Sequence, residues 1–366
     1  MVVIEGAGSC AEVNLMPHDI VNFRVAEYAD TPVILVGDIH RGGIFAQIIG
    51  TLACLPKEHI DRVIGFIINR FRGDIQLFQD GVEWIEERTD KRVFGVLPWY
   101  THFVIEAEDS VVIEHPKAVS VSTADKPAIA VIRIPHISNF TDFDPLSNID
   151  GIEVYFIEKV QDLSMFSAVI LPGTKNTRYD LNWIKDSGWG NTLKAYCEKG
   201  GHILGICGGY QMLGFSVHDD DGLEGKPGKT DGLNLLPIET YLKAPKTTTI
   251  TQFLWQGNQG RGYEIHMGHT AGSGEYSVFQ ILERNNVTCD DWDGCISIDG
   301  RVMGTYIHGM FDTPAILKRW LTQIGLKDIS IPEIAGPIAR DKDYDLLAKH
   351  FEKHIDVEGI LKSAME

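Results

Sequence analysis

The sequence predicts an α/β protein with two domains, each built around a mainly parallel sheet. Its 366 residues exceed what one ordinary hydrophobic core organises, which favours two domains. Short runs that are apolar throughout alternate with segments whose apolar residues recur at helical spacing. Continuously apolar strands are typical of parallel sheets that helices cover on both faces. In such sheets the functional loops follow the carboxyl ends of the strands.

The first part of the chain contains four of these strand-like runs. They are residues 2–5, 32–38, 62–69 and 92–98. From residue 111 to 127 the chain mixes Pro, Ser, Thr and charged residues without periodicity, which indicates a linker. We therefore predict a first domain over residues 1–116 and a linker over residues 117–127.

A second series of strand-like runs follows the linker and predicts a second domain over residues 128–330. The runs are residues 128–134, 167–173, 201–209 and 302–309. The polar, glycine-rich segment 218–231 is predicted to be a surface excursion. Residues 343–364 carry apolar side chains at helical spacing, so residues 331–366 are predicted to form a C-terminal helical extension.

Charge and cysteine content argue against several classes of protein. A formal net charge of −18 is unfavourable for binding nucleic acid or an anionic membrane surface. The six cysteines show no CxxC spacing, and the chain has no signal-peptide pattern and no membrane-spanning apolar run. We therefore expect a cytoplasmic protein. An anionic substrate would need a local cationic cluster, for which Arg41, Arg70 and Arg72 are the first candidates.

The stretch GICGGYQMLG places Cys207 between glycines, directly after an apolar run. A nucleophile on a tight strand-to-helix turn needs this arrangement, because glycines remove Cβ clashes and the helix N-terminus favours thiolate. The alternative is a small buried cysteine in a packing turn. Two other segments favour the nucleophile. His308 ends a later strand and could serve as its general base, and Gly173 follows a strand in LPGTKNT, where backbone N–H groups could form an oxyanion hole.

Seven segments in this order resemble the cobyric acid synthase family and span nearly the whole chain. They are EGAGSCAEVNL, GDIHRGGIFA, INRFRGD, LPGTKNT, GICGGYQMLG, GYEIHMG and YIHGMFD. The resemblance implies a P-loop, dethiobiotin-synthetase-like amide-ligase domain followed by a class I glutamine amidotransferase domain with a flavodoxin-like fold. It also implies a reaction in cobalamin biosynthesis. Glutamine-derived ammonia and ATP would amidate the b, d, e and g carboxylates of a corrin, adenosylcobyrinic acid a,c-diamide.

The resemblance also assigns roles in the amidotransferase domain. Cys207 is the expected glutaminase nucleophile and His308 its base, while Gln211 and Tyr263 are candidates for binding glutamine. Triad amidotransferases usually carry His-x-Glu, whereas this chain has Met310 at the place of the glutamate. The third member of the triad is therefore either supplied elsewhere in the chain or absent.

The ligase-domain roles rest on the same resemblance. Glu5 is expected to bind Mg²⁺ beside the phosphates of ATP, with a solvated strand-end acid as the alternative. Asp38 is expected to face the same site. Asn69 is a candidate for reading the adenine edge or for capping a loop, and Arg41 for binding a phosphate or a corrin carboxylate. His40 stands where the family usually has Asp, which puts the role of that position in doubt.

The family's glycine-rich phosphate loop precedes EGAGS and is not recognised in this sequence. Residues 222–230 approach the P-loop pattern, but they have one residue too many and follow no apolar strand. The sequence therefore predicts an incomplete ligase domain that does not turn over ATP alone and works with a separate P-loop-bearing fragment. The alternatives are a related ligase acting on another polycarboxylate, or an ATPase-inactive glutaminase or regulatory subunit.

Overall fold

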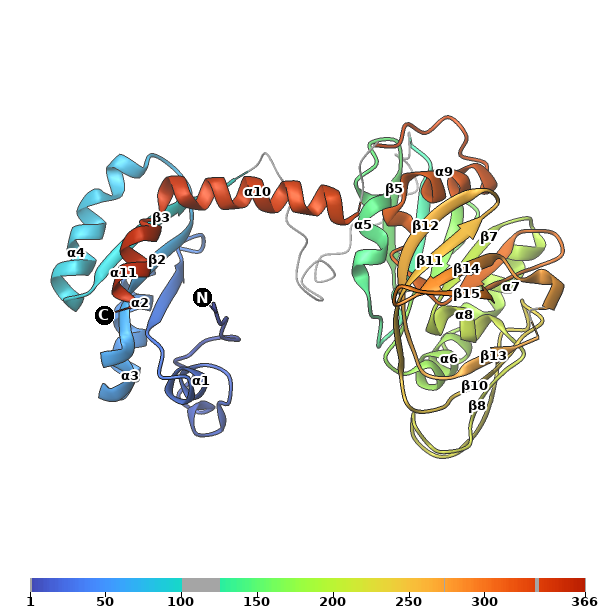
Figure 1. Cartoon of the computed structure of the whole chain (residues 1–366), viewed down its shortest axis with the longest axis horizontal. Helices are drawn as coiled ribbons and strands as arrows, with labels where there is room; N and C mark the ends of the chain where they lie inside the picture. The colour runs from blue at the N-terminus through green and yellow to red at the C-terminus, as the bar shows by residue number, and fades with distance from the viewer. Residues whose placement is uncertain (1, 101–125, 273, 333–335, 366) are drawn as a thin grey trace. The chain divides into compact units, whose positions relative to one another are not determined.

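The structure is a computed structural model that describes residues 2–100, 126–272, 274–332 and 336–365. The chain forms two compact units (Figure 1). The N-terminal unit contains the residues before the first gap together with the chain from Asp341 onward, and the second unit reaches Arg340. The predicted linker at residues 117–127 lies almost wholly outside the described residues. No helix of the described chain is long and apolar enough to cross a membrane.

The N-terminal unit is built on a three-stranded parallel sheet in the order β1-β2-β3. These strands are β1 (Val33–Asp38), β2 (Val63–Phe71) and β3 (Arg92–Pro98). Three of the four predicted runs therefore form strands close to their predicted bounds. The register pairs Asp38 with Asn69, so both side chains lie at the carboxyl edge of the sheet.

Neighbouring residues of these strands serve two separate hydrophobic clusters, because successive side chains of a strand point to opposite faces. Phe66 and Ile68 belong to a cluster that includes Ile48 and Ile85. Ile67 belongs to the other cluster. The helices of this part of the unit are α1 (Phe23–Tyr28), α2 (Ile44–Cys54), α3 (Lys57–Arg62) and α4 (Gln79–Thr89).

The second face is covered by the end of the chain, which returns to the N-terminal sheet. Two helices form this tail, α10 (Pro337–His354) and α11 (Val357–Ser363). Ile355 packs in the same cluster as Ile67 and pairs with Gly95 of β3 as an isolated antiparallel bridge. The approach requires glycine, since a Cβ on Gly95 would lie 2.2 Å from the His354 carbonyl oxygen. Asp356 adds a backbone hydrogen bond of 2.8 Å to Phe94.

The predicted strand at residues 2–5 is not present. Residues 2–7 have no strand assignment, and Val2 and Val3 are 84% and 91% exposed. A strand needs a hydrogen-bonded neighbour and an apolar run needs cover, and no described strand pairs with this segment. An apolar composition alone was therefore an insufficient reason for the prediction.

The second unit is centred on a six-stranded sheet in the order β16-β17-β7-β6-β4-β5. Its strands are parallel except for β16. The bounds are β4 (Ala128–Ile132), β5 (Glu153–Ile157), β6 (Phe166–Leu171), β7 (His202–Ile206), β16 (Cys295–Ile296) and β17 (Val302–Thr305). The four predicted runs of this domain supply β4, β6, β7 and β17. The fully buried β4 shows why such runs are apolar throughout.

Five helices complete the parallel part of this unit. They are α5 (Asp144–Ser147), α6 (Thr177–Asp186), α7 (Trp189–Glu198), α8 (Gly208–Leu213) and α9 (Pro314–Gln323). The predicted surface excursion at 218–231 instead carries the end of β8 (Ser216–Asp219) and all of β9 (Gly228–Asp231), which pair antiparallel. These two strands lie in a four-stranded sheet with β10 (Glu239–Tyr241) and β13 (His269–Ala271).

A five-stranded antiparallel sheet, absent from the sequence-based prediction, lies beside the parallel one. It has the order β15-β14-β11-β12-β18. The bounds are β11 (Thr247–Trp255), β12 (Asn258–His266), β14 (Phe279–Arg284), β15 (Val287–Asp293) and β18 (Ile307–His308). Strand β12 pairs with β18 through Tyr263 and His308, which brings this sheet to the candidate site.

Candidate active site

Cys207 lies on the tight turn between β7 and α8. Its backbone has φ 52° and ψ −109°, a conformation that a residue with a Cβ rarely adopts and that costs about 1–3 kcal/mol. Its N–H donates to the Thr305 carbonyl at 2.8 Å, which ties the turn to β17. Gly209 allows the close packing, because a Cβ there would lie 2.0 Å from the Leu171 carbonyl oxygen. The turn is therefore the strained strand-to-helix elbow expected of a nucleophile.

His308 ends β18 and is almost fully buried, at 1% exposure. Its Nδ1 atom lies 2.7 Å from Oδ2 of Asp142. Its Nε2 atom is buried and makes no hydrogen bond with any described residue. A carboxylate that accepts the Nδ1 proton fixes the tautomer and leaves Nε2 able to exchange a proton, as in Ser-His-Asp triads.

Asp142 is the carboxylate that pairs with His308, and the sequence did not identify it. It lies in a single 3-10 turn, η4 (Phe140–Phe143), which follows β4, and it is 3% exposed. Its second oxygen accepts the Gly309 N–H at 2.8 Å, so the carboxylate holds both His308 and the residue after it. The sequence offered one indication of Asp142, namely its position in the loop after the first predicted strand of the domain. The loops at the carboxyl ends of parallel strands lie close together.

The pKa of His308 reflects these neighbours. Burial by itself lowers the pKa, but the Asp142 carboxylate and the Cys207 side chain raise it, to about 10. The influence of Cys207 means that its thiol lies within electrostatic reach of the imidazole. The structure thus brings the two predicted catalytic residues together and adds a buried carboxylate behind them.

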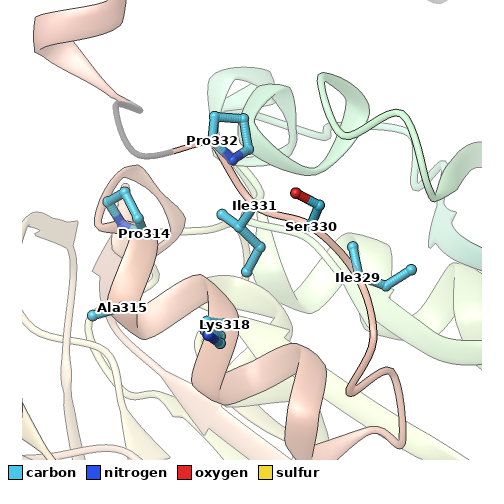
Figure 2. A pocket seen from close by; sticks show the side chains of 7 residues that line it. All are labelled: Pro314, Ala315, Lys318, Ile329, Ser330, Ile331 and Pro332. Atoms are coloured by element: carbon cyan, nitrogen blue, oxygen red, sulfur yellow. The ribbon is translucent and has the colours of Figure 1, made fainter.

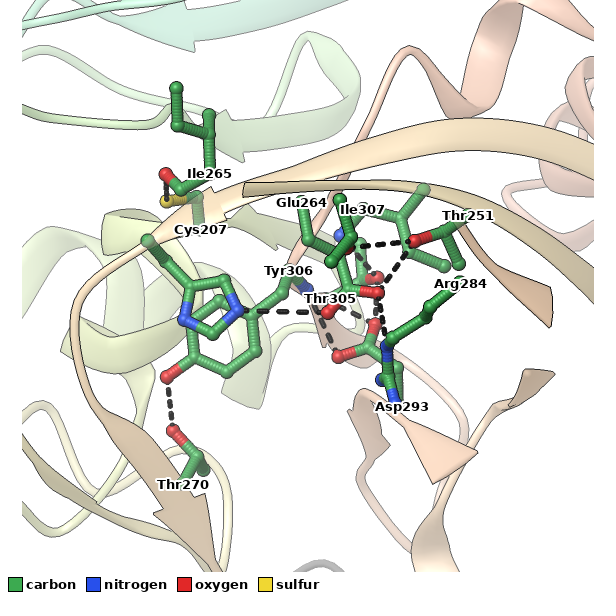
Figure 3. A network of polar contacts seen from close by, with 12 residues as sticks. Cys207, Thr251, Glu264, Ile265, Thr270, Arg284, Asp293, Thr305, Tyr306 and Ile307 are labelled. Carbon is green, nitrogen blue, oxygen red and sulfur yellow. Dashed lines mark hydrogen bonds and ion pairs between the residues drawn. The ribbon is translucent and has the colours of Figure 1, made fainter. Parts of the chain in front are cut away.

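The end of β12 lies beside the Cys207 side chain. The Cys207 Sγ atom lies 3.7 Å from the carbonyl oxygen of Ile265 (Figure 3). Tyr263, two residues earlier, stacks on the His308 ring with centroids 5.1 Å apart and donates no bond to it. Its hydroxyl instead accepts from Asn139 at 2.7 Å. Tyr263 therefore borders the imidazole, and its prediction as a glutamine-binding residue stays a prediction.

The loop after β6 approaches the imidazole of His308 and the Gly208 residue that follows Cys207. A Cβ on Gly173 would lie 3.1 Å from Cε1 of His308, and the Gly173 carbonyl accepts from the Ser138 N–H at 2.9 Å. The buried Asp180 anchors this loop, because it accepts from the Thr174 hydroxyl at 2.5 Å and pairs with His136 at 2.8 Å. The loop is thus fixed beside the imidazole, where an oxyanion hole is predicted.

Gln211 has its side-chain amide engaged within the protein. The amide oxygen accepts from Thr177 at 2.8 Å, and the amide nitrogen donates to the Met267 carbonyl at 3.0 Å and to the Tyr306 hydroxyl at 3.1 Å. Both amide hydrogens therefore have acceptors. The Gln211 side chain thus connects α8 to the segment after β12. Its amide is occupied by these contacts, which favours a structural role over the predicted binding of glutamine.

A buried polar network continues from this segment into the antiparallel sheet (Figure 3). Glu264 accepts from Thr251 at 2.7 Å and from Arg284 at 2.9 Å. Burial by itself raises the pKa of Glu264, but the neighbouring His266 ring, 3.6 Å away, and the hydrogen bonds from Arg284 and Thr251 lower it to about 2. Asp293 accepts from Thr305, and its burial raises its pKa to about 6. These contacts hold the end of β12 and the end of β17, both of which contact Cys207.

A separate hollow of about 330 Å³ in this unit contains none of these residues (Figure 2). It is lined by residues of α9 and of the segment that follows α9, namely Pro314, Ala315, Lys318, Ile329, Ser330, Ile331 and Pro332. Lys318 is the one ionisable side chain of this lining. The hollow therefore offers none of the chemistry that Cys207 and His308 provide.

The predicted residues of the N-terminal unit meet in part. Asp38 accepts from the His40 N–H at 2.8 Å and pairs with Arg70 at 3.0 Å. Asn69 accepts from the Arg70 N–H at 2.8 Å, as a loop cap does. Arg41 is exposed and forms no ion pair with a described residue. Glu5 is exposed and lies outside any described strand, so the structure does not place it with Asp38 at the sheet edge.

The described residues contain no cluster of three or more His, Cys, Asp or Glu side chains suited to a metal ion. Both carboxylate oxygens of Asp38 already accept hydrogen bonds, one from His40 and one from Arg70. Because Mg²⁺ is usually held by one or two carboxylates together with waters and substrate phosphates, Asp38 would hold it only with a bound nucleotide.

Two family models match the chain. One, described as a CobB/CobQ-like glutamine amidotransferase domain, covers residues 128–316, and one described as an AAA domain covers residues 1–106. The cobyric acid synthase of Chlorobium phaeobacteroides (strain DSM 266 / SMG 266 / 2430) is 46% identical over 98% of this chain and 71% of that protein. The chain belongs to the cobyric acid synthase family.

Two further cobyric acid synthases are similarly related to this chain. The cobyric acid synthase of Chlorobium chlorochromatii (strain CaD3) is 45% identical over 99% of this chain and 72% of that protein. That of Chloroflexus aurantiacus (strain ATCC 29366 / DSM 635 / J-10-fl) is 46% identical over 96% of this chain and 71% of that protein. The predictions of this family and of an α/β fold with a glutamine amidotransferase domain are confirmed.

In this member of the cobyric acid synthase family, the amidotransferase match includes Asp142 as well as Cys207 and His308. The matched residues begin at 128, where β4 begins, and end within α9. The triad geometry thus lies wholly inside the matched domain. The catalytic roles of its three residues remain predictions.

Proposed function

We propose that this protein is a cobyric acid synthase that releases ammonia from glutamine at Cys207 and uses it to amidate corrin carboxylates. The proposed substrates are the b, d, e and g carboxylates of adenosylcobyrinic acid a,c-diamide. The observation that carries the glutaminase half is the geometry of one site. A strained cysteine elbow lies beside an imidazole whose Nδ1 is held by a buried carboxylate.

Glutamine hydrolysis would proceed in two steps. The Cys207 thiolate attacks the side-chain carbonyl carbon of glutamine, and protonated His308 gives its proton to the departing nitrogen, which leaves as ammonia. A water molecule then loses a proton to His308 and hydrolyses the thioester, which regenerates the thiol and releases glutamate. Asp142 keeps its negative charge throughout and orients the imidazole through Nδ1.

The oxyanion of each tetrahedral intermediate needs donors beside the nucleophile. The Gly173 loop is next to His308, and Gly208 begins α8 directly after Cys207. Backbone N–H groups at the start of a helix have no intrahelical acceptor. We propose that N–H groups of these two segments stabilise the oxyanion, a contribution worth about 3 kcal/mol for one donor.

The amidation half is assigned to the N-terminal unit. When bound, ATP with Mg²⁺ would supply the phosphoryl group that activates a carboxylate toward ammonia. Asp38 and Asn69 lie at the carboxyl edge of the sheet, where ligands of such sheets bind. We place the reaction in the cytoplasm, a location supported by six cysteines that are all unpaired.

Replacement of the nucleophile tests the glutaminase proposal. Cys207→Ala should abolish glutamate release from glutamine, while corrin amidation with added ammonia should persist once the P-loop-bearing fragment is supplied. Cys197→Ala is the matched control, because burial raises the pKa of the Cys197 thiol to about 12 and leaves it unreactive. Glutamate release by Cys207→Ala at the wild-type rate would disprove the assignment.

A further inference from the structure

Two arginines stack on one tryptophan at the carboxyl edge of the N-terminal sheet. The guanidinium carbons of Arg70 and Arg72 lie 4.6 and 4.2 Å from the Trp99 ring centroid. The His40 ring lies 5.2 Å from the same indole. We call Arg70, Arg72, Trp99 and His40 the tryptophan cluster. The glutaminase and ligase steps proposed for this protein assign no role to these four residues.

Each part of the tryptophan cluster follows a different strand. His40 follows β1, the arginines come from the end of β2 and just beyond it, and Trp99 follows β3. The backbone N–H of Trp99 donates to the Phe71 carbonyl at 2.7 Å, which fixes the indole beside the arginines. His350 of α10 bonds the Pro98 carbonyl at 2.9 Å from the other side. The cluster is thus assembled where parallel sheets bind ligands.

The backbone at Arg70 is strained. Its φ is 61°, in the left-handed region that costs a non-glycine residue about 1–3 kcal/mol. The Asn69 side chain accepts the Arg70 N–H and so supports this conformation. In this conformation the Arg70 side chain contacts both Asp38 and the indole. Strain of this kind is concentrated at binding and catalytic sites.

The two guanidinium groups differ in charge balance. Arg70 is paired with Asp38 at 3.0 Å, whereas Arg72 forms no ion pair with a described residue. Among the described residues, the Arg72 guanidinium therefore keeps an unpaired positive charge on the ring, in a chain whose net charge is −18. Stacking occupies the face of a guanidinium and leaves the N–H donors along its edge available for a planar oxyanion.

We propose that the tryptophan cluster binds an anionic oxygen group of the substrates, with Arg72 as the principal donor. The chemistry is that of a carboxylate or phosphate held edge-on by a guanidinium. Its two sources in the proposed reaction are a peripheral carboxylate of the corrin and a phosphate of ATP. The inference rests on the proposed function for the identity of these sources, and on the cluster itself for the chemistry.

Binding to the full chain tests the proposal with two probes, cobyrinic acid a,c-diamide followed by its visible absorbance and ATP followed by equilibrium dialysis. The variants are Arg72→Gln, Arg72→Lys and Trp99→Leu. Arg88→Gln is the matched control, because Arg88 is an exposed cation in the last turn of α4, just before β3 begins at the opposite sheet edge. It removes the same charge without touching the cluster. Thermal unfolding shows that each variant remains folded.

We expect Arg72→Gln to weaken one probe roughly tenfold or more, as loss of a hydrogen bond to a charged group does. Arg72→Lys should bind that probe more tightly than Arg72→Gln but less tightly than the wild type. The affinity of Trp99→Leu should likewise lie between those of Arg72→Gln and the wild type. Weakened corrin binding identifies a carboxylate, and weakened ATP binding identifies a phosphate. If the wild type binds a probe and Arg72→Gln matches Arg88→Gln, the proposal is overturned while the proposed function stands. If the wild type binds neither probe, even with the P-loop-bearing fragment added, the proposed ligase function fails as well.

Discussion

Asp142 and His308 are 166 positions apart in the chain, yet their side chains meet at 2.7 Å in the core of the second unit. The carboxylate comes from a single 3-10 turn after β4, and the imidazole comes from β18 of the antiparallel sheet. The pair therefore connects the two kinds of sheet in this unit. It also completes a Cys-His-Asp arrangement in which Met310 stands at the usual place of a glutamate.

The first prediction concerns Asp142 as a positioning residue. Asp142→Asn should reduce kcat for glutamine hydrolysis by roughly 10²–10⁴-fold with little change in KM, because the amide cannot stabilise imidazolium. The pH profile should also shift to lower pH, since the Asp142 carboxylate is what raises the pKa of His308. Asp150→Asn, an exposed acid shortly after the same turn, is the control. An unchanged rate and profile would contradict the role.

The second prediction concerns stability against pH. Because the pKa of His308 is raised from 6.5 to about 10 in the folded protein, the stabilisation from this pair is fully present below pH 6.5 and is lost as pH rises through about 10. The difference in unfolding free energy between wild type and Asp142→Asn should therefore shrink over that range. Urea unfolding at about pH 6, 8 and 10 measures it. A difference that stays constant would refute the coupling.

The third prediction concerns the buried carboxylate of Glu264. Glu264→Gln should destabilise the second unit by about 3 kcal/mol at neutral pH, because Arg284 loses a buried partner. Hydrogen bonds lower the pKa of Glu264 from 4.5 to about 2, so this stabilisation is present above pH 4.5 and is lost as pH falls through about 2. Thermal unfolding across that range checks the sign. Asp290→Asn, an exposed acid on β15, should show no comparable effect.

The fourth prediction concerns the tail helices. Ile355 is 4% exposed in the cluster that covers one face of the N-terminal sheet, so Ile355→Ala should cost about 2–4 kcal/mol there. Hydrogen exchange should accelerate in β1, β2 and β3 and remain slow in the second unit. Leu361→Ala, at a position 36% exposed, serves as the control. Equal protection of β3 in Ile355→Ala and wild type would show that the tail does not stabilise the sheet.

The part of the site that follows a local pattern could be predicted from the sequence. The glycines around Cys207 and the strand before it predicted the elbow, because a tight turn restricts which residues can form it. Asp142 could not be found in this way, since nothing in its own turn specifies a partner 166 positions later. Long-range pairs of this kind depend on the order in which strands enter the sheet.

The errors in the fold have equally local reasons. Residues 247–255 form β11, in which more and less buried positions alternate with the period of two that is typical of a half-exposed strand. The predicted strands were instead continuously apolar runs. The same criterion predicted a strand at residues 2–5, where apolar side chains are exposed. Continuous hydrophobicity therefore found the parallel sheets and missed the antiparallel one.

The return of the tail to β3 has a consequence for biosynthesis. Arg92 and Asp356 form an ion pair across 264 positions. The N-terminal sheet is therefore synthesised before the second unit, whereas the tail helices that cover one of its faces are synthesised after that unit. Contacts of such large sequence separation form slowly, because a long loop must close before they contribute. Until these contacts form, the apolar face of β2 and β3 is exposed, and we expect a chaperone to bind it. The contacts of the amidotransferase unit lie within its own segment of the chain. This unit can therefore fold before the N-terminal unit is complete.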